Sequence, residues 1–335
     1  MNALILQSPG MASIETVPEP VLNEGVLLRV RMVGLCGSDL NSFRGLNPLV
    51  SFPRILGHEV CATVVQGDSD LPAGTDVALL PYTSCGRCAS CRRARPNACQ
   101  FNQTLGVQRD GGLTQLIVMP REKLFPARLE PKELCFVEPL TIGFHAVARG
   151  RITANDTVAV FGCGGVGLGA IAGSNCRGAR TICVDVDDEK LEVARAAGGS
   201  HTINSTRESL HDRLLELTGG LGPDVVIEAV GRPATFRAAV EEVAFTGRVV
   251  YIGYAKEPVS YETRLFVQKE LDVLGSRNAQ PEDFHAVIHL LESAKFPVDQ
   301  AISLIVPLEE AASALRSWSE NPPRFKKILV SLDQL

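Results

Sequence analysis

The feature that most restricts the fold of this chain is a run of glycines between two regular elements. Gly162-Cys163-Gly164-Gly165-Val166-Gly167 follows an apolar strand pattern, 157–161, and opens a helical stretch. Glycine permits the tight turn and the close packing that a strand followed at once by a helix requires. The pattern therefore indicates a strand–turn–helix unit of a parallel sheet.

The same turn is a candidate phosphate site, because the first N–H groups of a helix are unpaired and carry partial positive charge. The glycine pattern alone is a weak signal, but Asp185 ends the next strand, roughly twenty residues further on. A carboxylate there can accept hydrogen bonds from an adenosine ribose. Asp187 and Asp188 add negative charge that would repel a 2′-phosphate, so the sequence favours NAD.

Two later glycines are less certain candidates. Gly231 and Gly253 each follow a predicted strand of the same region. They are either turns at the edge of the cofactor site or ordinary loop glycines. A glycine turn that only packs a helix on a strand remains the alternative reading of Gly162–Gly167.

The 335 residues predict two domains. From about Thr141 onward strands alternate with amphipathic helices, which is typical of a doubly wound parallel sheet. The earlier part consists of short strands and turns, and the segment after Gly275 is expected to return to it. We therefore expect an α/β chain with a β-rich domain, residues 1–145 and 276–335, and a parallel-sheet domain, residues 146–275.

The composition excludes several classes of protein. Thirty-three Lys and Arg against 38 Asp and Glu give a net charge of −5, which offers no general attraction to nucleic acid or an anionic membrane. Residues 1–7 lack the features of a signal peptide, and the most apolar stretch, 158–172, is too short to span a bilayer. We expect a cytoplasmic protein with no nucleic-acid or membrane partner.

Four of the ten cysteines stand close together, at Cys85, Cys88, Cys91 and Cys99. The surrounding stretch has no apolar periodicity and so no core of its own. This spacing lets four thiolates bind one tetrahedral zinc, with no coordination position left open, so the predicted site is structural. Neighbouring arginines allow an alternative reading as a nucleic-acid module, but the acidic total and the absence of aromatic residues among the cysteines argue against it.

A second constellation consists of Cys36-Gly37-Ser38-Asp39, Gly57-His58-Glu59 and Glu138. Cysteine, histidine and carboxylates all bind zinc, and three protein ligands leave one position for water or substrate. Each residue also has an ordinary reading: Cys36 as a buried thiol, His58 as a core histidine and Glu138 as a helix-capping acid.

Together these motifs resemble the zinc-dependent medium-chain dehydrogenase/reductase family, in its alcohol, sorbitol and threonine dehydrogenase branches. The motifs occur in the family's order and approximate spacing over almost the whole chain. The resemblance implies a GroES-like catalytic domain with a structural zinc lobe, and a Rossmann NAD-binding domain. It also implies two zinc ions per chain and a homodimer or homotetramer.

By the same resemblance Cys36 and His58 bind a catalytic zinc. Glu138 stands at the position of the third ligand, while Glu59 can enter the metal shell instead, and the sequence leaves open which acid binds directly. Ser38 would accept the proton of the alcohol.

Two further positions follow from the resemblance. Asp39 would orient the ring of His58. Asn41 stands where many relatives carry a histidine that passes the proton to solvent, so the end of the proton relay is open.

The segments 269–278 and 281–284 are similar to bacterial sugar-acid dehydrogenases of the L-galactonate 5-dehydrogenase type. The resemblance thus implies a zinc-dependent oxidoreductase that transfers hydride from a secondary alcohol of a polyol or sugar acid to NAD. A threonine-type amino-alcohol dehydrogenase shares the same parts. A non-catalytic zinc- and nucleotide-binding protein is the alternative of another class.

Overall fold

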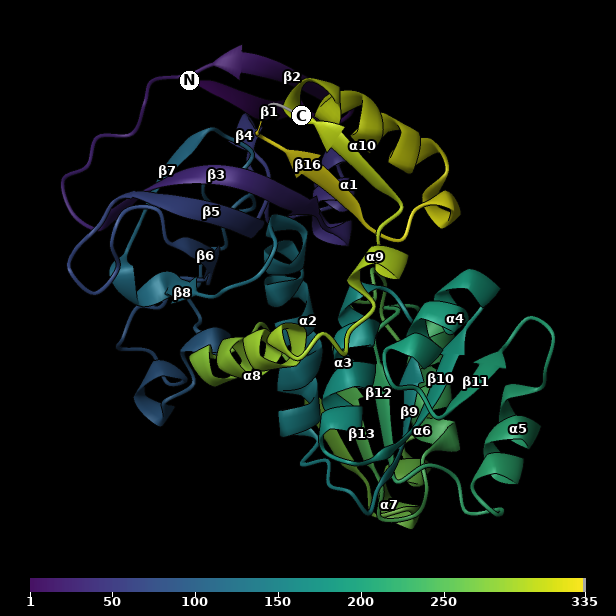
Figure 1. Cartoon of the computed structure of the whole chain (residues 1–335). Helices are drawn as coiled ribbons and strands as arrows, with labels where there is room; N and C mark the ends of the chain where they lie inside the picture. Colours follow the sequence, from purple (N-terminus) through teal and green to yellow (C-terminus); the bar gives the residue numbers. More distant parts are fainter. Residues whose placement is uncertain (334–335) are drawn as a thin grey trace. The chain divides into compact units, whose positions relative to one another are not determined.

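The computed structural model describes residues 1–333, which fall into two compact units (Figure 1). Unit 1 comprises Met1–Pro139, Gln280–Glu292 and the chain from Val298 onward, and unit 2 comprises Leu140–Ala279 and Ser293–Pro297. The domain borders expected from the sequence, 145/146 and 275/276, stay a prediction.

Unit 2 contains a six-stranded sheet in the order β11-β10-β9-β12-β13-β14. All neighbouring strands are parallel. The strands are β9 (Thr157–Phe161), β10 (Arg180–Asp185), β11 (His201–Asn204), β12 (Val225–Glu228), β13 (Arg248–Tyr251) and β14 (Asp272–Gly275). Val and Ile dominate the buried strands, as a sheet covered on both faces requires. The predicted parallel sheet is confirmed.

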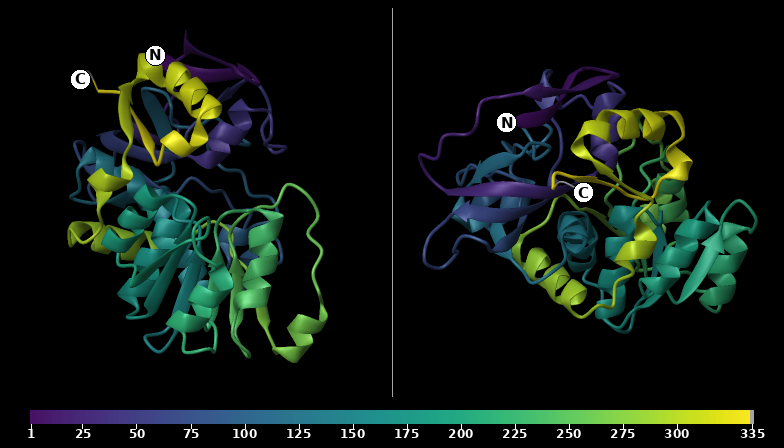
Figure 2. Two further views of the ribbon diagram at one scale, coloured as in Figure 1. Left: turned by 90° about the vertical axis from the view of Figure 1, so that its right-hand side faces the viewer. Right: turned by 45° about the horizontal axis from the view of Figure 1, so that its top comes forward.

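Helices pack against this sheet (Figure 2). They are α3 (Gly165–Cys176), α4 (Asp188–Ala196), α5 (Leu210–Leu217), α6 (Pro233–Glu242) and α7 (Arg264–Gln268). The chain order reverses between β9 and β12, the two central strands. In sheets of this kind, ligands bind beyond the carboxyl ends of the strands at such a reversal.

Unit 1 contains the β-rich part of the chain, as predicted. A three-stranded sheet has the order β2-β1-β4, and a larger sheet has the order β15-β16-β3-β5-β6-β8, with β7 also paired to β3. Their bounds are β1 (Asn2–Ser8), β2 (Met11–Thr16), β3 (Val26–Leu35), β4 (Arg54–Ile55), β5 (Glu59–Gln66), β6 (Asp76–Leu79), β7 (Leu116–Met119), β8 (Leu124–Pro126), β15 (Leu304–Pro307) and β16 (Ile328–Ser331).

The helices of unit 1 include α1 (Gly37–Phe43), α8 (Pro281–Glu292), α9 (Val298–Ala301) and α10 (Ala311–Glu320). A further helix, α2 (Pro131–Arg149), contains Pro139 and contributes residues to both units. The sequence patterns did not predict α2, because a proline inside a helix removes a backbone hydrogen bond and disguises the period. No helix within residues 1–333 is both long and apolar enough to cross a membrane.

Candidate functional site

Strand pairing brings together the first group of predicted site residues. In the antiparallel pair of β3 and β5, Gly34 is directly opposite Glu59. Cys36 follows the end of β3 and His58 precedes β5, so the two motifs meet at one end of the sheet. The ligand atoms of Cys36, His58 and Glu59 lie within 4.8 Å of one another. The register of this one strand pair thus brings together residues that are separated in the sequence.

Glu59 is held in this group by a buried lysine. Lys327 Nζ lies 2.7 Å from Glu59 Oε1 and 2.6 Å from Oε2, and it also donates to the carbonyl oxygen of Leu35 at 3.3 Å. The pairing of Ile328 with Leu35 places the start of β16 beside the end of β3. Lys327 and Glu59 are 6% and 1% exposed, so the ion pair is screened from water.

The carboxylate of Asp39 holds the backbone around this group. Its Oδ2 accepts the N–H of Cys36 at 2.9 Å, and its Oδ1 accepts the N–H of Gly57 at 3.3 Å. Asp39 Oδ1 lies 3.9 Å from His58 Nδ1, which is longer than a hydrogen bond. Asp39 therefore positions the two ligand-bearing segments through their backbone and acts on the His58 ring by charge.

The electrostatics of the group favour a cation. Burial opposes charge on His58, yet the negative charges of Asp39 and Cys36 raise its pKa well above the usual value. Burial raises the pKa of Asp39. His58 Nδ1 is buried and has no hydrogen-bond partner within residues 1–333. This nitrogen faces Asp39, and the ligand atoms of Cys36, His58 and Glu59 converge, so this donor set fits a bound metal ion.

Glu138 comes from α2 and pairs with a tyrosine. Glu138 and Tyr82 are each 5% exposed, and the Tyr82 hydroxyl donates to Glu138 Oε1. Burial raises the pKa of Glu138, and burial next to Glu138 raises the pKa of Tyr82 well above its usual range. Among the described residues, the group of atoms within 4.8 Å contains Glu59 but not Glu138.

Ser38 lies in the first turn of α1, two residues after Cys36. Its Oγ is buried and has no hydrogen-bond partner in the described part of the chain. A hydroxyl in that position has both its donor and its acceptor capacity available for a bound molecule.

The four cysteines of the predicted lobe also converge. Their Sγ atoms lie within 4.8 Å of one another, and Cys88 Sγ is 3.4 Å from Cys91 Sγ and 3.8 Å from Cys99 Sγ. Zinc–sulfur bonds of about 2.3 Å in a tetrahedron separate the sulfurs by roughly 3.8 Å. All ten cysteines are free, so no disulfide competes for these thiols. The donor set fits a tetrahedral metal ion.

Local hydrogen bonds prepare these thiols for a metal. The Ser90 hydroxyl and nearby backbone N–H groups lower the pKa of Cys88 to about 5. A backbone hydrogen bond from Arg87 lowers the pKa of Cys85, whereas burial and the neighbouring sulfurs raise the pKa of Cys91 to about 11. Thiolates that repel one another need a cation between them, as a structural zinc provides.

The glycine turn of unit 2 has the geometry that its sequence predicts. Gly162 has a φ of +95°, and a Cβ there would lie 2.8 Å from Val230 Cγ2. A Cβ on Gly167 would overlap the carbonyl oxygen of Gly162, so α3 could not pack as closely. A Cβ on Gly164, just before α3, would meet no atom within 4 Å, which leaves open space beside the helix N-terminus.

Asp185 lies at the carboxyl end of β10, next to that turn. Its Oδ2 accepts the N–H of Cys163 at 2.7 Å, and its Oδ1 accepts the N–H groups of Val186 and Asp187 at 2.8 and 3.2 Å. The turn and the carboxylate are thus joined by a direct hydrogen bond. They stand together as the predicted dinucleotide site requires.

Asp187 and Asp188 make local contacts in addition to carrying negative charge. The Asp187 side chain caps α4 by accepting from Glu189 and Lys190. Asp188 pairs with Arg207 at 2.6 Å. This ion pair weakens the argument that Asp188 repels a 2′-phosphate, and leaves Asp185 as the main residue that favours NAD.

The sequence patterns did not indicate Lys327 and Tyr82 as site residues. A lysine at the start of an otherwise apolar strand is a signal for Lys327, because an isolated buried lysine needs a buried acid. Tyr82 has no comparable signal, since its partner Glu138 lies far along the chain.

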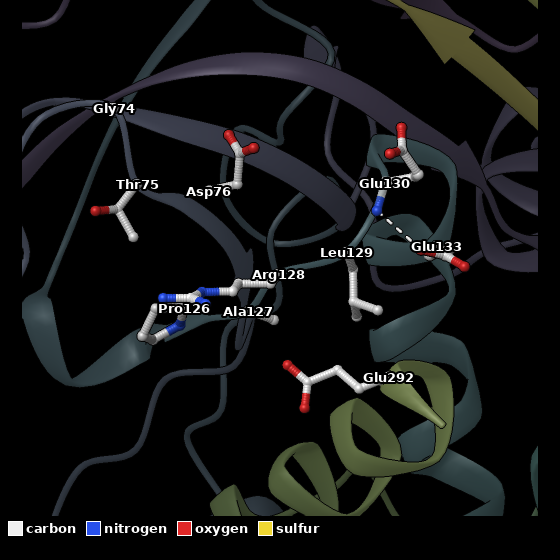
Figure 3. A pocket seen from close by; sticks show the side chains of 10 residues that line it. All are labelled: Gly74, Thr75, Asp76, Pro126, Ala127, Arg128, Leu129, Glu130, Glu133 and Glu292. Carbon is white, nitrogen blue, oxygen red and sulfur yellow. Dashed lines mark hydrogen bonds between the residues drawn. The ribbon is translucent and has the colours of Figure 1, made fainter. Parts of the chain in front are cut away.

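A separate pocket of unit 1 has a volume of about 710 Å³ (Figure 3). Its charged side chains are Asp76, Arg128, Glu130, Glu133 and Glu292, and the backbone N–H of Glu130 donates to Glu133. None of the predicted ligand or cofactor residues lines it. Acids on an open surface do not by themselves define a ligand site, so we do not assign the substrate to this pocket.

Comparison with known families agrees with this geometry. Residues 23–129 match the family described as alcohol dehydrogenase GroES-like domain, and residues 165–293 match the family described as zinc-binding dehydrogenase. L-galactonate-5-dehydrogenase of Escherichia coli (strain K12) is 32% identical over 318 residues, which cover 93% of each chain. Sorbitol dehydrogenase of Bacillus subtilis (strain 168) is 34% identical over 289 residues, which cover 82% of this chain and 81% of the relative.

Two solved structures extend the comparison to cofactors. A short chain alcohol dehydrogenase from E. coli CFT073, complexed with NADH, has a TM-score of 0.89 at 28% identity and covers 99% of both chains. A zinc-binding dehydrogenase from Sinorhizobium meliloti 1021, bound to NADP, has a TM-score of 0.89 at 30% identity and covers 98% of both chains.

Fold and site thus define an oxidoreductase that uses zinc and a nicotinamide dinucleotide on a small-molecule substrate. The chain belongs to the zinc-dependent medium-chain dehydrogenase family, as its motifs predicted.

Proposed function

We propose that this protein oxidises a secondary alcohol of a polyol or sugar acid, of the L-galactonate type, with NAD as hydride acceptor. The observation that carries the proposal is the convergence of half-buried Cys36 with buried His58 and Glu59, whose ligand atoms lie within 4.8 Å of one another. The substrate class is supported by relatives whose names specify L-galactonate and sorbitol.

Cys36 and His58 would hold the catalytic zinc, and a carboxylate completes the set. Of the two acids, Glu59 is the one with an oxygen within 4.8 Å of the ligand atoms of Cys36 and His58, although both of its oxygens accept from Lys327. Glu138 is the other candidate and accepts from Tyr82. Glu59→Gln and Glu138→Gln variants separate the two readings, because only loss of the true third ligand lowers the zinc content.

When bound, zinc supplies a Lewis acid that acidifies a hydroxyl, and NAD supplies the hydride acceptor. The chain would supply the proton relay: the Ser38 Oγ, buried without a partner in the described chain, would accept the hydroxyl proton and pass its own proton on toward the ribose of the dinucleotide. Asp39 fixes the backbone of Cys36 and Gly57, which keeps both ligand segments in place as the charge changes.

NAD is our proposed cofactor because a carboxylate, not a cation, ends β10. Asp185 would accept the ribose hydroxyls, and Gly162, Gly164, Gly165, Val166 and Gly167 would surround the pyrophosphate. Gly231 and Gly253 would border the same site.

We further propose two zinc ions per chain, the second held by Cys85, Cys88, Cys91 and Cys99. This zinc is structural, since four thiolates occupy every coordination position.

A homodimer or homotetramer is also proposed. The sheet of unit 2 ends at β14, where Val273 is 44% exposed. An exposed edge strand with apolar side chains favours pairing with another chain. Light scattering of the purified protein tests this, and a monomer at micromolar concentration contradicts it.

The main experiment follows NADH formation with the purified protein across polyols, aldonates and L-threonine. We expect turnover with a sugar acid or polyol, and no turnover in Cys36→Ala, which should still bind NADH. Turnover with L-threonine alone would favour the amino-alcohol dehydrogenase. Full activity of Cys36→Ala would contradict the zinc site, and no NADH from any substrate would favour the non-catalytic alternative.

A further inference from the structure

Unit 2 contains a buried carboxylate that the proposed reaction does not use. Glu228 is the last residue of β12 and is 0% exposed. In the sheet it stands level with Phe161, the last residue of β9. Glu228 therefore lies at the central pair of strands, where the chain order reverses and ligands of such sheets bind.

One oxygen of the Glu228 carboxylate accepts hydrogen bonds from the turn that follows β12. Oε1 accepts the N–H of Val230 at 2.9 Å, the N–H of Gly231 at 2.8 Å and the hydroxyl of Thr235 at 2.7 Å. Thr235 belongs to the first turn of α6. This oxygen thus fixes both the turn after β12 and the start of the helix after it.

The same residue also holds the next turn along the sheet. Its backbone carbonyl accepts the N–H of Ile252 at 2.9 Å and the N–H of Gly253 at 3.1 Å. A Cβ on Gly253 would lie 2.5 Å from Glu228 Oε2, so only glycine allows this close approach. Glu228 consequently contacts the turns after both β12 and β13.

The glycine turn after β9 packs against the first of these turns. The N–H of Ala229 donates to the carbonyl of Phe161 at 2.9 Å, and a Cβ on Gly162 would lie 2.8 Å from Val230 Cγ2. The turn that the Glu228 carboxylate holds therefore lies between the turns after β9 and β13 and packs against both of them.

Burying the Glu228 carboxylate costs free energy of folding. Glu228 Oε2 is buried and has no hydrogen-bond partner among residues 1–333. A buried oxygen without a partner costs free energy, and the three hydrogen bonds to Oε1 offset part of that cost. The residue is better explained by what it positions than by stability.

We infer that Glu228 is a positioning residue for the nicotinamide dinucleotide: its carboxylate fixes the turn at Gly231, against which the turns at Gly162 and Gly253 pack. The inference rests on the proposed function, because it assumes that the dinucleotide binds at this edge. Loss of the Glu228 contacts should weaken cofactor binding more than it disturbs the fold.

The sharpest test changes Thr235 and leaves the carboxylate in place. Thr235→Val removes the hydroxyl that contacts Oε1 and also the backbone N–H and carbonyl of Arg232, whereas Thr235→Ser keeps it. We expect the Kd of NADH, measured by titration calorimetry on the full chain, to rise roughly three- to tenfold in Thr235→Val. The Kd of Thr235→Ser should stay within about twofold of the parent.

Glu228→Ala, compared with Val226→Ala, separates positioning from stability. Val226 lies in the same strand and is also 0% exposed, so Val226→Ala lowers the melting temperature without touching the turns. We expect a Kd for NADH at least tenfold higher in Glu228→Ala and nearly unchanged in Val226→Ala, with the same zinc content in both. If Glu228→Ala does not fold, the Thr235 pair decides.

The outcomes distinguish this inference from the proposed function. If the parent protein binds NADH and both Thr235→Val and Glu228→Ala bind it equally well, Glu228 does not position the cofactor, although the dehydrogenase proposal stands. If Val226→Ala weakens binding as much as Glu228→Ala, general destabilisation explains the effect and the inference is overturned. If the parent binds neither NADH nor NADPH, both proposals are wrong.

Discussion

Lys327 and Glu59 form a buried ion pair in which one ammonium group spans both carboxylate oxygens, at 2.6 and 2.7 Å. Their side chains are 7% and 1% exposed. Glu59 belongs to the cysteine–histidine–glutamate group, so the lysine determines where this acid lies before any metal binds. Sheet stability and the metal site are thus coupled through one contact.

Replacing Lys327 should therefore destabilise the protein strongly. Lys327→Met leaves the Glu59 carboxylate buried without its counter-charge, which costs about 3–5 kcal/mol in free energy of unfolding. Urea denaturation measures this change in the free energy of unfolding. Lys132→Met is the matched control, since the pair of Lys132 with Asp299 at 2.5 Å is exposed and its loss should cost less than about 1 kcal/mol. Equal effects of the two substitutions would refute the coupling, and adding Glu59→Gln to Lys327→Met should recover part of the loss.

Gly34 is the residue that makes room for this pair. A Cβ at Gly34 would overlap Glu59 Oε2, which the lysine prevents from moving away. Gly34→Ala should destabilise the protein by about 1–3 kcal/mol and lower its zinc content. Gly275→Ala is the control, because a Cβ there meets nothing within 4 Å. A Gly34→Ala variant with parental stability and zinc content would show that Glu59 has another position available.

The sequence predicted those parts of the site that depend on local pattern. The glycine turn, the strand before it and the four-cysteine lobe are each formed by residues close in the chain, so spacing was enough to predict their shape. Asp185 was found because it ends a strand at a fixed distance from that turn.

Contacts between distant segments could not be predicted from the sequence patterns. Lys327 lies 268 residues from Glu59, and Tyr82 lies 56 residues from Glu138. Only the register of β16 on β3, and the packing of α2, bring these pairs together. Likewise no sequence pattern singled out Glu228, since period-2 patterning does not distinguish a buried acid that holds a turn from an edge residue.

Asp185→Ala should impair cofactor binding specifically. The substitution removes the expected ribose acceptor and the acceptor for the Cys163 N–H. Hydrogen bonds to a charged group are strong, so the Kd of NADH should rise roughly ten- to a hundredfold, with a smaller effect on NADPH. Asp224→Ala is the control, since Asp224 accepts the N–H of Thr157 at 2.7 Å at the other end of β9. A parental Kd for NADH in Asp185→Ala would place the ribose elsewhere.

The pair of His211 with Glu242 predicts a local pH dependence. Their side chains meet at 2.9 Å, and the hydrogen bond that His211 donates to Glu242 raises the pKa of His211 above its usual value. The folded state therefore favours the charged imidazole. Its stabilising contribution is complete below about pH 6.5 and is lost as the pH rises through the raised pKa. NMR titration should give a higher midpoint for His211 in the parent than in Glu242→Gln, and identical midpoints would contradict the assignment.

Replacing one cysteine of the four-cysteine lobe should release one metal ion and make residues 81–101 more susceptible to proteolysis. Cys91→Ser takes away one of four converging thiolates, and the lobe has no apolar core to replace the metal. We expect zinc content, measured by mass spectrometry, to fall by about one ion per chain, and proteolysis to become faster within residues 81–101, because a tetrahedral thiolate site needs all four ligands. Cys176→Ser is the matched control, because Cys176 is exposed and lies in α3, outside the lobe. Unchanged zinc content in Cys91→Ser, or an equal loss in Cys176→Ser, would exclude the lobe as a zinc site.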